Sequence, residues 1–181
     1  TLETDPYGLA KVAAERAALE FVAALPQAER FELVHLNPGM VWGPPMIKAH
    51  AKASPMLVRD IISRTQPGVP HIMLGLVDVR EVSAAHVAAL QATDPPLRCL
   101  LVAENAWMGD LASRRQACFP DVSMTTRRSP KLLVLAAALF DAKLNFAQLR
   151  KLVGRAMPMD GALSKTAYGM HYRPVDETLH D

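Results

Sequence analysis

The sequence predicts an α/β protein with a mainly helical C-terminal part. Strands are expected where short apolar runs are bounded by charged residues, proline or glycine, at 31–36, 71–77 and 97–103. Amphipathic or alanine-rich segments of helical spacing alternate with these runs, at 5–25, 54–65 and 78–93. Beyond them the helical pattern dominates, at 107–118, 130–153 and 161–170. Alternation followed by helices is typical of the α/β class.

The composition excludes several classes of partner. Half of the 181 residues are hydrophobic and 21% are charged, which is enough apolar sequence to bury a sizeable core. The net charge is only +2, and the basic residues are dispersed, so no nucleic-acid partner is expected. The longest apolar run, at 132–140, is about half the roughly 20 residues that a membrane helix needs. We therefore expect neither nucleic acid nor membrane as a partner.

The cysteines and histidines indicate no metal site. Cys99 and Cys118 lie far apart without metal-ligand spacing, and two isolated thiols do not make a disulfide framework. The six histidines have no ligand spacing with one another or with a carboxylate. No signal peptide is visible at the N-terminus, and a reduced cytoplasmic location is the simplest interpretation.

The segment DPYGLAK, residues 5–11, carries the candidate chemistry. Asp5 is suited to cap a helix, and Pro6 suits its first position, where a missing N–H costs nothing. Tyr7 and Lys11 then stand four residues apart and share one helix face. An ammonium near a phenol stabilises the phenolate form, which a proton-transferring tyrosine requires. The alternative is structural: Tyr7 packs on the core while Lys11 faces water.

A rigid, proline-rich loop is predicted at 37–45, directly after the first strand. Open α/β sheets bind ligands at the carboxyl ends of their strands, so this loop is a candidate site. Met40 and Trp42 either line a substrate pocket or pack in the core. Further along, Asp78 is interpreted as a helix cap, Arg80 as a partner in an internal ion pair and His86 as a helix-face histidine.

The order of four segments adds a family resemblance. They are YGLAKVAAERAALEFVAAL, NPGMVWGP, DVREVSAAHVAAL and DGALSKTAYGMHYRPVDETLHD. Together they resemble the extended short-chain dehydrogenase/reductase superfamily, in particular its dihydroflavonol-reductase and cinnamoyl-CoA-reductase branch. The resemblance covers nearly the whole chain but corresponds to the C-terminal half of a family member. It implies the end of a Rossmann-type, doubly wound parallel sheet over 1–45. The remaining sheet elements and a small, mainly helical substrate-binding subdomain follow over 46–181.

The resemblance also implies roles for individual residues. Tyr7 matches the tyrosine that protonates the carbonyl oxygen, and Lys11 matches the lysine that holds the nicotinamide ribose. The segment Pro38, Gly39, Met40 and Val41 matches the loop against the nicotinamide, where a residue without Cβ permits close approach. Ser54 lies near a phosphate-contacting position, although a plain helix cap explains it better. The implied cofactor is NADP, with NAD possible, and the implied substrate is a small carbonyl compound.

Two departures from the family pattern shape the expected function. Ala10 stands where relatives commonly carry serine before the lysine. The glycine-rich turn that binds pyrophosphate, and the upstream serine or threonine that polarises the carbonyl, are absent from these residues. We expect the 181 residues alone to be inactive and an N-terminal half to lie upstream. The alternatives are a non-catalytic regulatory protein on the same scaffold or a 3β-hydroxysteroid-dehydrogenase-like enzyme. A homodimer through the alanine-rich first helix is compatible with the sequence.

Overall fold

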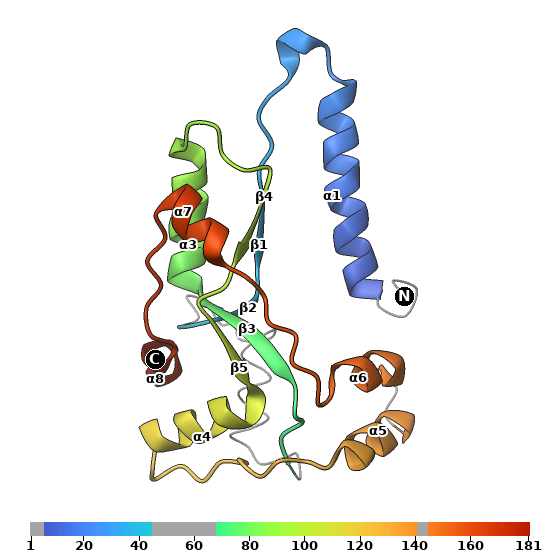
Figure 1. Cartoon of the computed structure of the whole chain (residues 1–181), viewed down its shortest axis with the longest axis vertical. Helices are drawn as coiled ribbons and strands as arrows, with labels where there is room; N and C mark the ends of the chain where they lie inside the picture. The colour runs from blue at the N-terminus through green and yellow to red at the C-terminus, as the bar shows by residue number, and fades with distance from the viewer. Residues whose placement is uncertain (1–5, 45–67, 141–144) are drawn as a thin grey trace.

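The computed structural model describes residues 6–44, 68–140 and 145–181. Helix α1 (Pro6–Ala24) runs along one side of the molecule and ends in the short 3-10 helix η2 (Gln27–Glu29). Arg30 closes the end of α1, since its guanidinium donates to the carbonyl oxygens of Ala23 at 2.8 Å and Leu25 at 3.0 Å. The chain then turns back along the opposite direction into the first strand (Figure 1).

Five strands form two small sheets. Strand β1 (His35–Pro38) pairs in parallel with β4 (Arg98–Leu101). Strand β2 (Met40–Trp42) pairs in parallel with β3 (Met73–Asp78), and β5 (Glu104–Trp107) pairs antiparallel with β3. The predicted α/β class is confirmed, and the strand order places β3 at the centre of the larger sheet.

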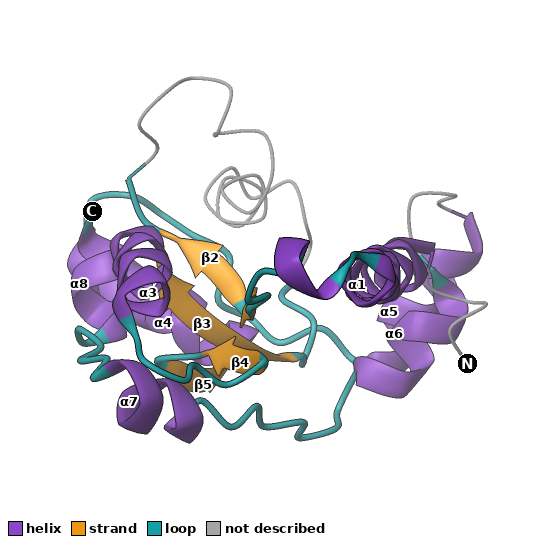
Figure 2. Cartoon of the chain, turned by 90° about the horizontal axis from the view of Figure 1, so that it is seen from above, coloured by secondary structure: helices purple, strands orange, loops and turns teal. Residues whose placement is uncertain are grey.

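The core lies on both faces of β3, because neighbouring residues of a strand point to opposite faces. Leu76 packs with Trp42 of β2, with Leu111 of α4 (Met108–Cys118) and with two residues of α8 (Val175–His180). Val77 packs on the other face against α3 (Val79–Gln91), β4 and Met170. Viewed from above, α3, α7 and α8 lie to one side of the strands, while α1, α5 and α6 lie to the other (Figure 2).

The long helix predicted over 130–153 is wrong. The structure has α5 (Lys131–Phe140) and α6 (Phe146–Leu152), and the second begins at a new N-cap. The side-chain oxygen of Asn145 accepts from the backbone N–H of Gln148 at 3.0 Å, and Asn145 itself has an extended backbone. The short helix predicted over 161–170 is confirmed as α7 (Ala162–Tyr168).

Strand positions show a second set of corrections. The run 31–36 was predicted as a strand, but β1 begins only at His35. The reason is pairing, since His35 lies opposite Arg98, the first residue of β4. The loop predicted at 37–45 also contains the last residues of β1 and all of β2. Neither β5 nor α8 was expected. The helix predicted at 54–65 lies outside the described residues.

Candidate active site

Tyr7 and Lys11 lie together on the exposed first turns of α1. The Nζ atom of Lys11 is 5.5 Å from the centroid of the Tyr7 ring, as expected for residues one helical turn apart. The Tyr7 side chain is 74% exposed, so its hydroxyl is open to a ligand. The structural alternative, in which Tyr7 packs on the core, is therefore wrong for the described residues. The expected cap Asp5 lies outside them.

Helix α1 as a whole has no buried residue. An ion pair joins it to the sheet, in which Nε of Arg98 on β4 lies 3.2 Å from Oε1 of Glu15. Because α1 and β1 run in opposite directions, the first turn of α1 lies at the same end of the fold as the carboxyl end of β1 (Figure 1). That is the end at which open α/β sheets bind ligands.

The segment Pro38–Val41 crosses from one sheet to the other. Pro38 ends β1 opposite Leu101, and the N–H of Gly39 donates to the Leu101 carbonyl oxygen at 3.0 Å. A Cβ on Gly39 would lie 2.4 Å from the carbonyl oxygen of Gly75 on β3. The expected rationale for this glycine was close approach to a flat ring. The structure instead gives it a packing reason, since only glycine lets β2 lie against β3 here.

Asn37, just before this segment, is a polar residue that the sequence reasoning missed. Its side-chain amide nitrogen is buried and has no hydrogen-bond partner among the described residues. An unsatisfied buried donor is unfavourable by about 1–3 kcal/mol, so such a group is a candidate for binding an acceptor on a ligand. A polar residue between Leu36 and Pro38, at the carboxyl end of a parallel strand, was the available signal.

The structure brings together some of the predicted site residues and not others. Tyr7 and Lys11 contact one another on α1, and Pro38, Gly39, Met40 and Val41 form one continuous crossing. No interaction recorded for the described residues joins these two groups. Ser54 lies outside the described residues. Met40 packs against the core cluster around Leu76.

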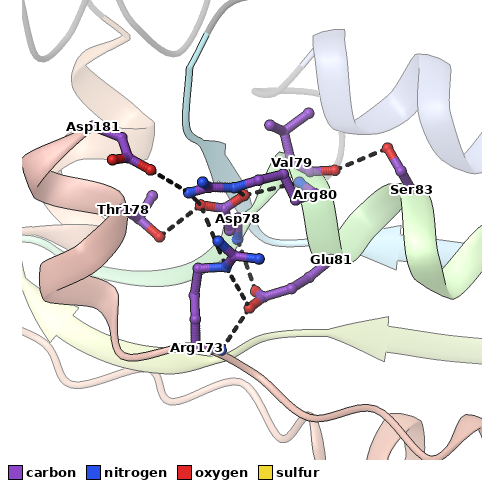
Figure 3. Close-up of polar contacts among 8 residues, drawn as sticks. All are labelled: Asp78, Val79, Arg80, Glu81, Ser83, Arg173, Thr178 and Asp181. Carbon is purple, nitrogen blue, oxygen red and sulfur yellow. Dashed lines mark hydrogen bonds and ion pairs between the residues drawn. The ribbon is translucent and has the colours of Figure 1, made fainter.

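Asp78, at the end of β3, is the centre of a buried polar junction (Figure 3). Its Oδ1 accepts from Nε of Arg80 at 2.9 Å, and its Oδ2 from Nη2 of Arg80 at 2.7 Å. The Thr178 hydroxyl donates to Oδ2 at 2.8 Å. Burial alone would raise the pKa of the Asp78 carboxyl, but the hydrogen bonds from Arg80 and Thr178 outweigh it and lower that pKa to about 2.

The same junction extends to α3 and to the chain before α8. Asp78 and Glu81 form a capping box, in which Oε2 of Glu81 accepts from the Asp78 N–H at 3.2 Å. Oε1 of Glu81 accepts from the N–H of Arg173 at 2.6 Å. Arg80 reaches Oδ2 of Asp181 at 2.7 Å. The predicted cap at Asp78 and the internal ion pair of Arg80 are thus confirmed, and His86 is an exposed helix-face residue as expected.

A cavity of about 220 Å³ lies at the start of α4, away from the predicted site residues. Its wall includes the stacked rings of His71 and Trp107, whose centroids are 3.8 Å apart. Burial and the nearby Arg128 lower the pKa of His71. None of the predicted catalytic or cofactor residues lines this cavity. Within the described ranges, no group of His, Cys, Asp or Glu side chains could hold a metal ion.

The parallel strands, the crossing at Gly39 and the Tyr–Lys pair agree with the expected resemblance to the extended short-chain dehydrogenase/reductases. No family model matches the chain. It is 28% identical to the NADPH-dependent methylglyoxal reductase GRE2 of Saccharomyces cerevisiae, over 99% of this chain and 51% of that protein. It is 29% identical to cinnamoyl-CoA reductase 1 of Arabidopsis thaliana, over 67% of this chain and 34% of that protein.

A solved structure agrees with these relatives. The yeast methylglyoxal/isovaleraldehyde reductase Gre2 complexed with NADPH matches with a TM-score of 0.68 and 25% identity, over 93% of this chain and 46% of that one. The chain spans at most about half the length of the curated relatives it matches. The resemblance inferred from the motifs is confirmed: the chain is homologous to part of the extended short-chain dehydrogenase/reductase superfamily, and its fold is the C-terminal half of a Rossmann-type protein. No helix in the described part has the length and apolar character needed to cross a membrane.

Proposed function

We propose that the chain is the C-terminal part of an NAD(P)H-dependent carbonyl reductase. The observation that carries this proposal is the exposed Tyr7–Lys11 pair on α1, in a chain that aligns over 99% of its length with an NADPH-dependent reductase. In this function Tyr7 donates a proton to the substrate's carbonyl oxygen as it becomes an alcohol oxygen. Lys11 supplies positive charge beside the phenol and favours the phenolate that remains.

The residues at this end of the fold suit a nicotinamide cofactor. Lys11 offers an exposed donor for ribose hydroxyls, and the buried side-chain nitrogen of Asn37 lacks an acceptor among the described residues. The backbone of Pro38–Val41 would hold the ring. When bound, the reduced cofactor supplies the hydride for the carbonyl carbon. We favour NADPH because the named reductase relative depends on it, and NAD remains the alternative.

We further propose that an upstream nucleotide-binding half completes the site and covers α1. The supporting observation is the apolar surface on this helix, since Leu9 and Phe21 are exposed and α1 buries none of its residues. A parallel sheet normally has both faces covered and continues beyond two strands, and among the described residues β1 pairs with β4 alone. A homodimer through α1 would cover the same surface.

The free cysteines Cys99 and Cys118 support a reduced, cytoplasmic setting.

The proposal is tested by NADPH oxidation with small aldehydes and ketones, using the protein extended by its upstream coding sequence. Tyr7→Phe is expected to lower kcat by roughly 10²–10⁴-fold, because it removes the proton donor while keeping the ring. Tyr168→Phe is the matched control, since that hydroxyl lies on α7 and reaches only the Pro96 carbonyl oxygen at 3.5 Å. Equal turnover in the wild type and in Tyr7→Phe would remove Tyr7 from the mechanism.

Lys11 is tested separately through cofactor binding. Lys11→Met keeps the aliphatic stem but removes the ammonium, so the KM for NADPH is expected to rise together with a loss of kcat. Lys151→Met on α6 is the control for the loss of one surface charge. The unextended 181-residue chain is expected to bind NADPH weakly. A stoichiometric, tight complex in a calorimetric titration would contradict the need for an upstream half.

A further inference from the structure

The stretch Gly39–Gly43, which includes most of the candidate cofactor segment Pro38–Val41, packs closely at both ends, against the Gly75 backbone of β3 and against the side chains of Asp78 and Val79. At one end, Gly39 lies against the Gly75 carbonyl, where a Cβ would be 2.4 Å from the oxygen. At the other end, Gly43 has a φ of 129°, and a Cβ there would lie 2.9 Å from Cγ1 of Val79 and 3.3 Å from Oδ1 of Asp78. No residue with a side chain fits either position without displacement. The position of β2 is therefore set by the position of β3 and of the Asp78 carboxylate.

The register between β2 and β3 also links the position of β2 to Asp78. Met40, Val41 and Trp42 lie opposite Leu76, Val77 and Asp78 in the parallel ladder. Trp42, the last residue of β2, thus pairs with the residue at the centre of the polar junction. Any shift of Asp78 moves the end of β2, and with it the two residues of the candidate cofactor segment that lie in this strand.

Helix α8 contacts both strands of this pair. Its apolar residues Val175 and Leu179 pack in one cluster with Trp42 of β2 and Leu76 of β3. Its Thr178 hydroxyl donates to Oδ2 of Asp78 at 2.8 Å, across 100 residues of sequence. The helix ends beside Arg80, which pairs with Asp181 at 2.7 Å. One short helix therefore takes part in both the apolar cluster and the polar junction at the β2–β3 pair, and Figure 3 shows the polar contacts.

We propose that Asp78 and Thr178 are positioning residues, which place β2 and the attached Pro38–Val41 segment for cofactor binding. The proposal rests on the proposed reductase function. Neither residue needs to touch the cofactor, because the effect passes through the β2–β3 register and the apolar cluster that Trp42 shares with Val175 and Leu179 of α8. Thr178 holds α8 on the junction, and Asp78 holds the end of β3 against Gly43.

Thr178→Val tests this role with little change of volume. It removes the hydroxyl that Asp78 accepts from and puts a methyl group against a buried carboxylate. Thr178→Ser keeps the donor and is the rescue variant. Ser164→Ala is the control, because it also removes a fully buried hydroxyl, on α7, which donates to the Gly161 carbonyl oxygen at 2.6 Å and lies 2.7 Å from the Tyr172 hydroxyl. Thr178→Val and Ser164→Ala each lose one buried hydroxyl donor. A change seen only in Thr178→Val therefore reports positioning, whereas a change seen in both reports a general loss of stability.

The first measurement follows β2 without any cofactor. In a Trp107→Phe background, Trp42 is the sole tryptophan of the 181 residues, and its emission reports the contact between β2 and α8. Thr178→Val is expected to shift this emission to the red and to increase acrylamide quenching. Thr178→Ser and Ser164→Ala are expected to retain the wild-type emission. Wild-type emission and quenching in folded Thr178→Val would overturn the proposal.

The second measurement is the KM for NADPH in the upstream-extended protein. Thr178→Val is expected to raise it by roughly 3- to 10-fold while kcat changes less, and Thr178→Ser is expected to restore it. An unchanged KM in Thr178→Val, or an equal rise in Ser164→Ala, would overturn the positioning role. An extended wild type that oxidises no NADPH with any carbonyl would instead defeat the reductase function and the cofactor part of this inference. The Trp42 emission would still show whether α8 places β2.

Discussion

Helix α1 and the α8 junction are opposite kinds of structure within one chain. Helix α1 is nineteen residues long and buries none of them. Helix α8 is six residues long and buries three, namely Val175, Thr178 and Leu179. The long helix is held to the sheet by a surface ion pair, whereas the short one is held by a hydrophobic cluster and a buried carboxylate.

The two groups of candidate site residues therefore differ in how firmly they are packed. Tyr7 and Lys11 lie on the weakly held helix, and the crossing Pro38–Val41 lies on the well-packed β2–β3 pair. Local stability follows the number of buried apolar contacts and shielded hydrogen bonds, so α1 is expected to open at low free energy. In the proposed reductase, an upstream half would be needed to fix Tyr7, while the support for the cofactor segment is contained in this chain.

The largest effect on this contrast is expected from Asp78→Ala. The substitution removes the carboxylate that accepts two hydrogen bonds from the Arg80 side chain, which keeps its ion pair with Asp181, and leaves the Thr178 hydroxyl without its acceptor. Removing one partner of a buried ion pair costs about 3–5 kcal/mol, and we expect a loss of that size in the free energy of unfolding. Urea denaturation followed by circular dichroism measures it. Asp176→Ala, which removes an exposed partner of Arg114, is the control and is expected to cost under about 1 kcal/mol. A small effect of Asp78→Ala would show that the junction does not stabilise the fold.

A second comparison truncates one leucine in each region. Leu179→Ala on α8 opens a cavity beside Trp42, since Leu179 is only 3% exposed. We expect it to lower the free energy of unfolding by about 2–4 kcal/mol. Leu9→Ala on α1 removes a side chain that is 46% exposed, and it is expected to cost under about 1 kcal/mol. The same urea titration compares the two. Equal losses would mean that α1 is as firmly packed as α8.

How much of the fold was predictable depends on the range of the interactions. The start of helix α3 was predicted to within one residue because Asp78 is a capping residue, and in the structure it forms a capping box with Glu81 within one turn. The boundary of β1 was wrong because it depends on Arg98, more than sixty residues further along the chain. Strand β5 was missed for the same reason, since the segment 104–107 becomes a strand only by pairing with β3. The long helix predicted over 130–153 was wrong because Asn145 begins a new helix as its N-cap, and the apolar pattern concealed this cap.

The candidate site residues also divide into those marked by local sequence and those whose contacts are long-range. The juxtaposition of Tyr7 and Lys11 was predictable because their spacing lies within one helix, and the structure confirms that they share a face; their catalytic role stays a prediction. Asp78 was recognised only as a cap. Its bond to Thr178 spans 100 residues, and no local pattern marks a threonine near the C-terminus as its partner. Gly39 was expected to be a special position, and its close approach to the Gly75 carbonyl gives it a packing reason, while its approach to a cofactor ring stays a prediction.

The pH dependence of stability gives a smaller, specific test of the junction. The folded-state pKa of Asp78 is lowered to about 2, below its ordinary value, so the native state favours the ionised form. The resulting stability is fully present above the ordinary pKa and is lost as the pH falls from roughly 4 toward 2. The lowering of the Asp78 pKa on folding corresponds to about 2 kcal/mol in the free energy of unfolding. Urea midpoints measured across this range should fall more steeply in the wild type than in Asp78→Asn. Equal slopes of the urea midpoint against pH in the two proteins would show that ionisation of Asp78 does not control the loss of stability at low pH.

The smallest effect is expected at the ion pair that holds α1 to the sheet. Glu15→Gln removes the carboxylate 3.2 Å from Nε of Arg98, whose side chain is largely exposed, so water and salt already screen the pair. A cost of about 0.5 kcal/mol or less is expected, and it should disappear at high salt. Amide hydrogen exchange is the suitable measurement, because it reads α1 separately from the core. Exchange in α1 should be fast in the wild type, slightly faster in Glu15→Gln at low salt, and equal in the two at 1 M salt, where the screening length is only about 3 Å. Glu20→Gln, on the same helix, is the control for the loss of one charge. Slow exchange in wild-type α1 would show that more than this ion pair holds the helix, and the contrast with α8 would then fail.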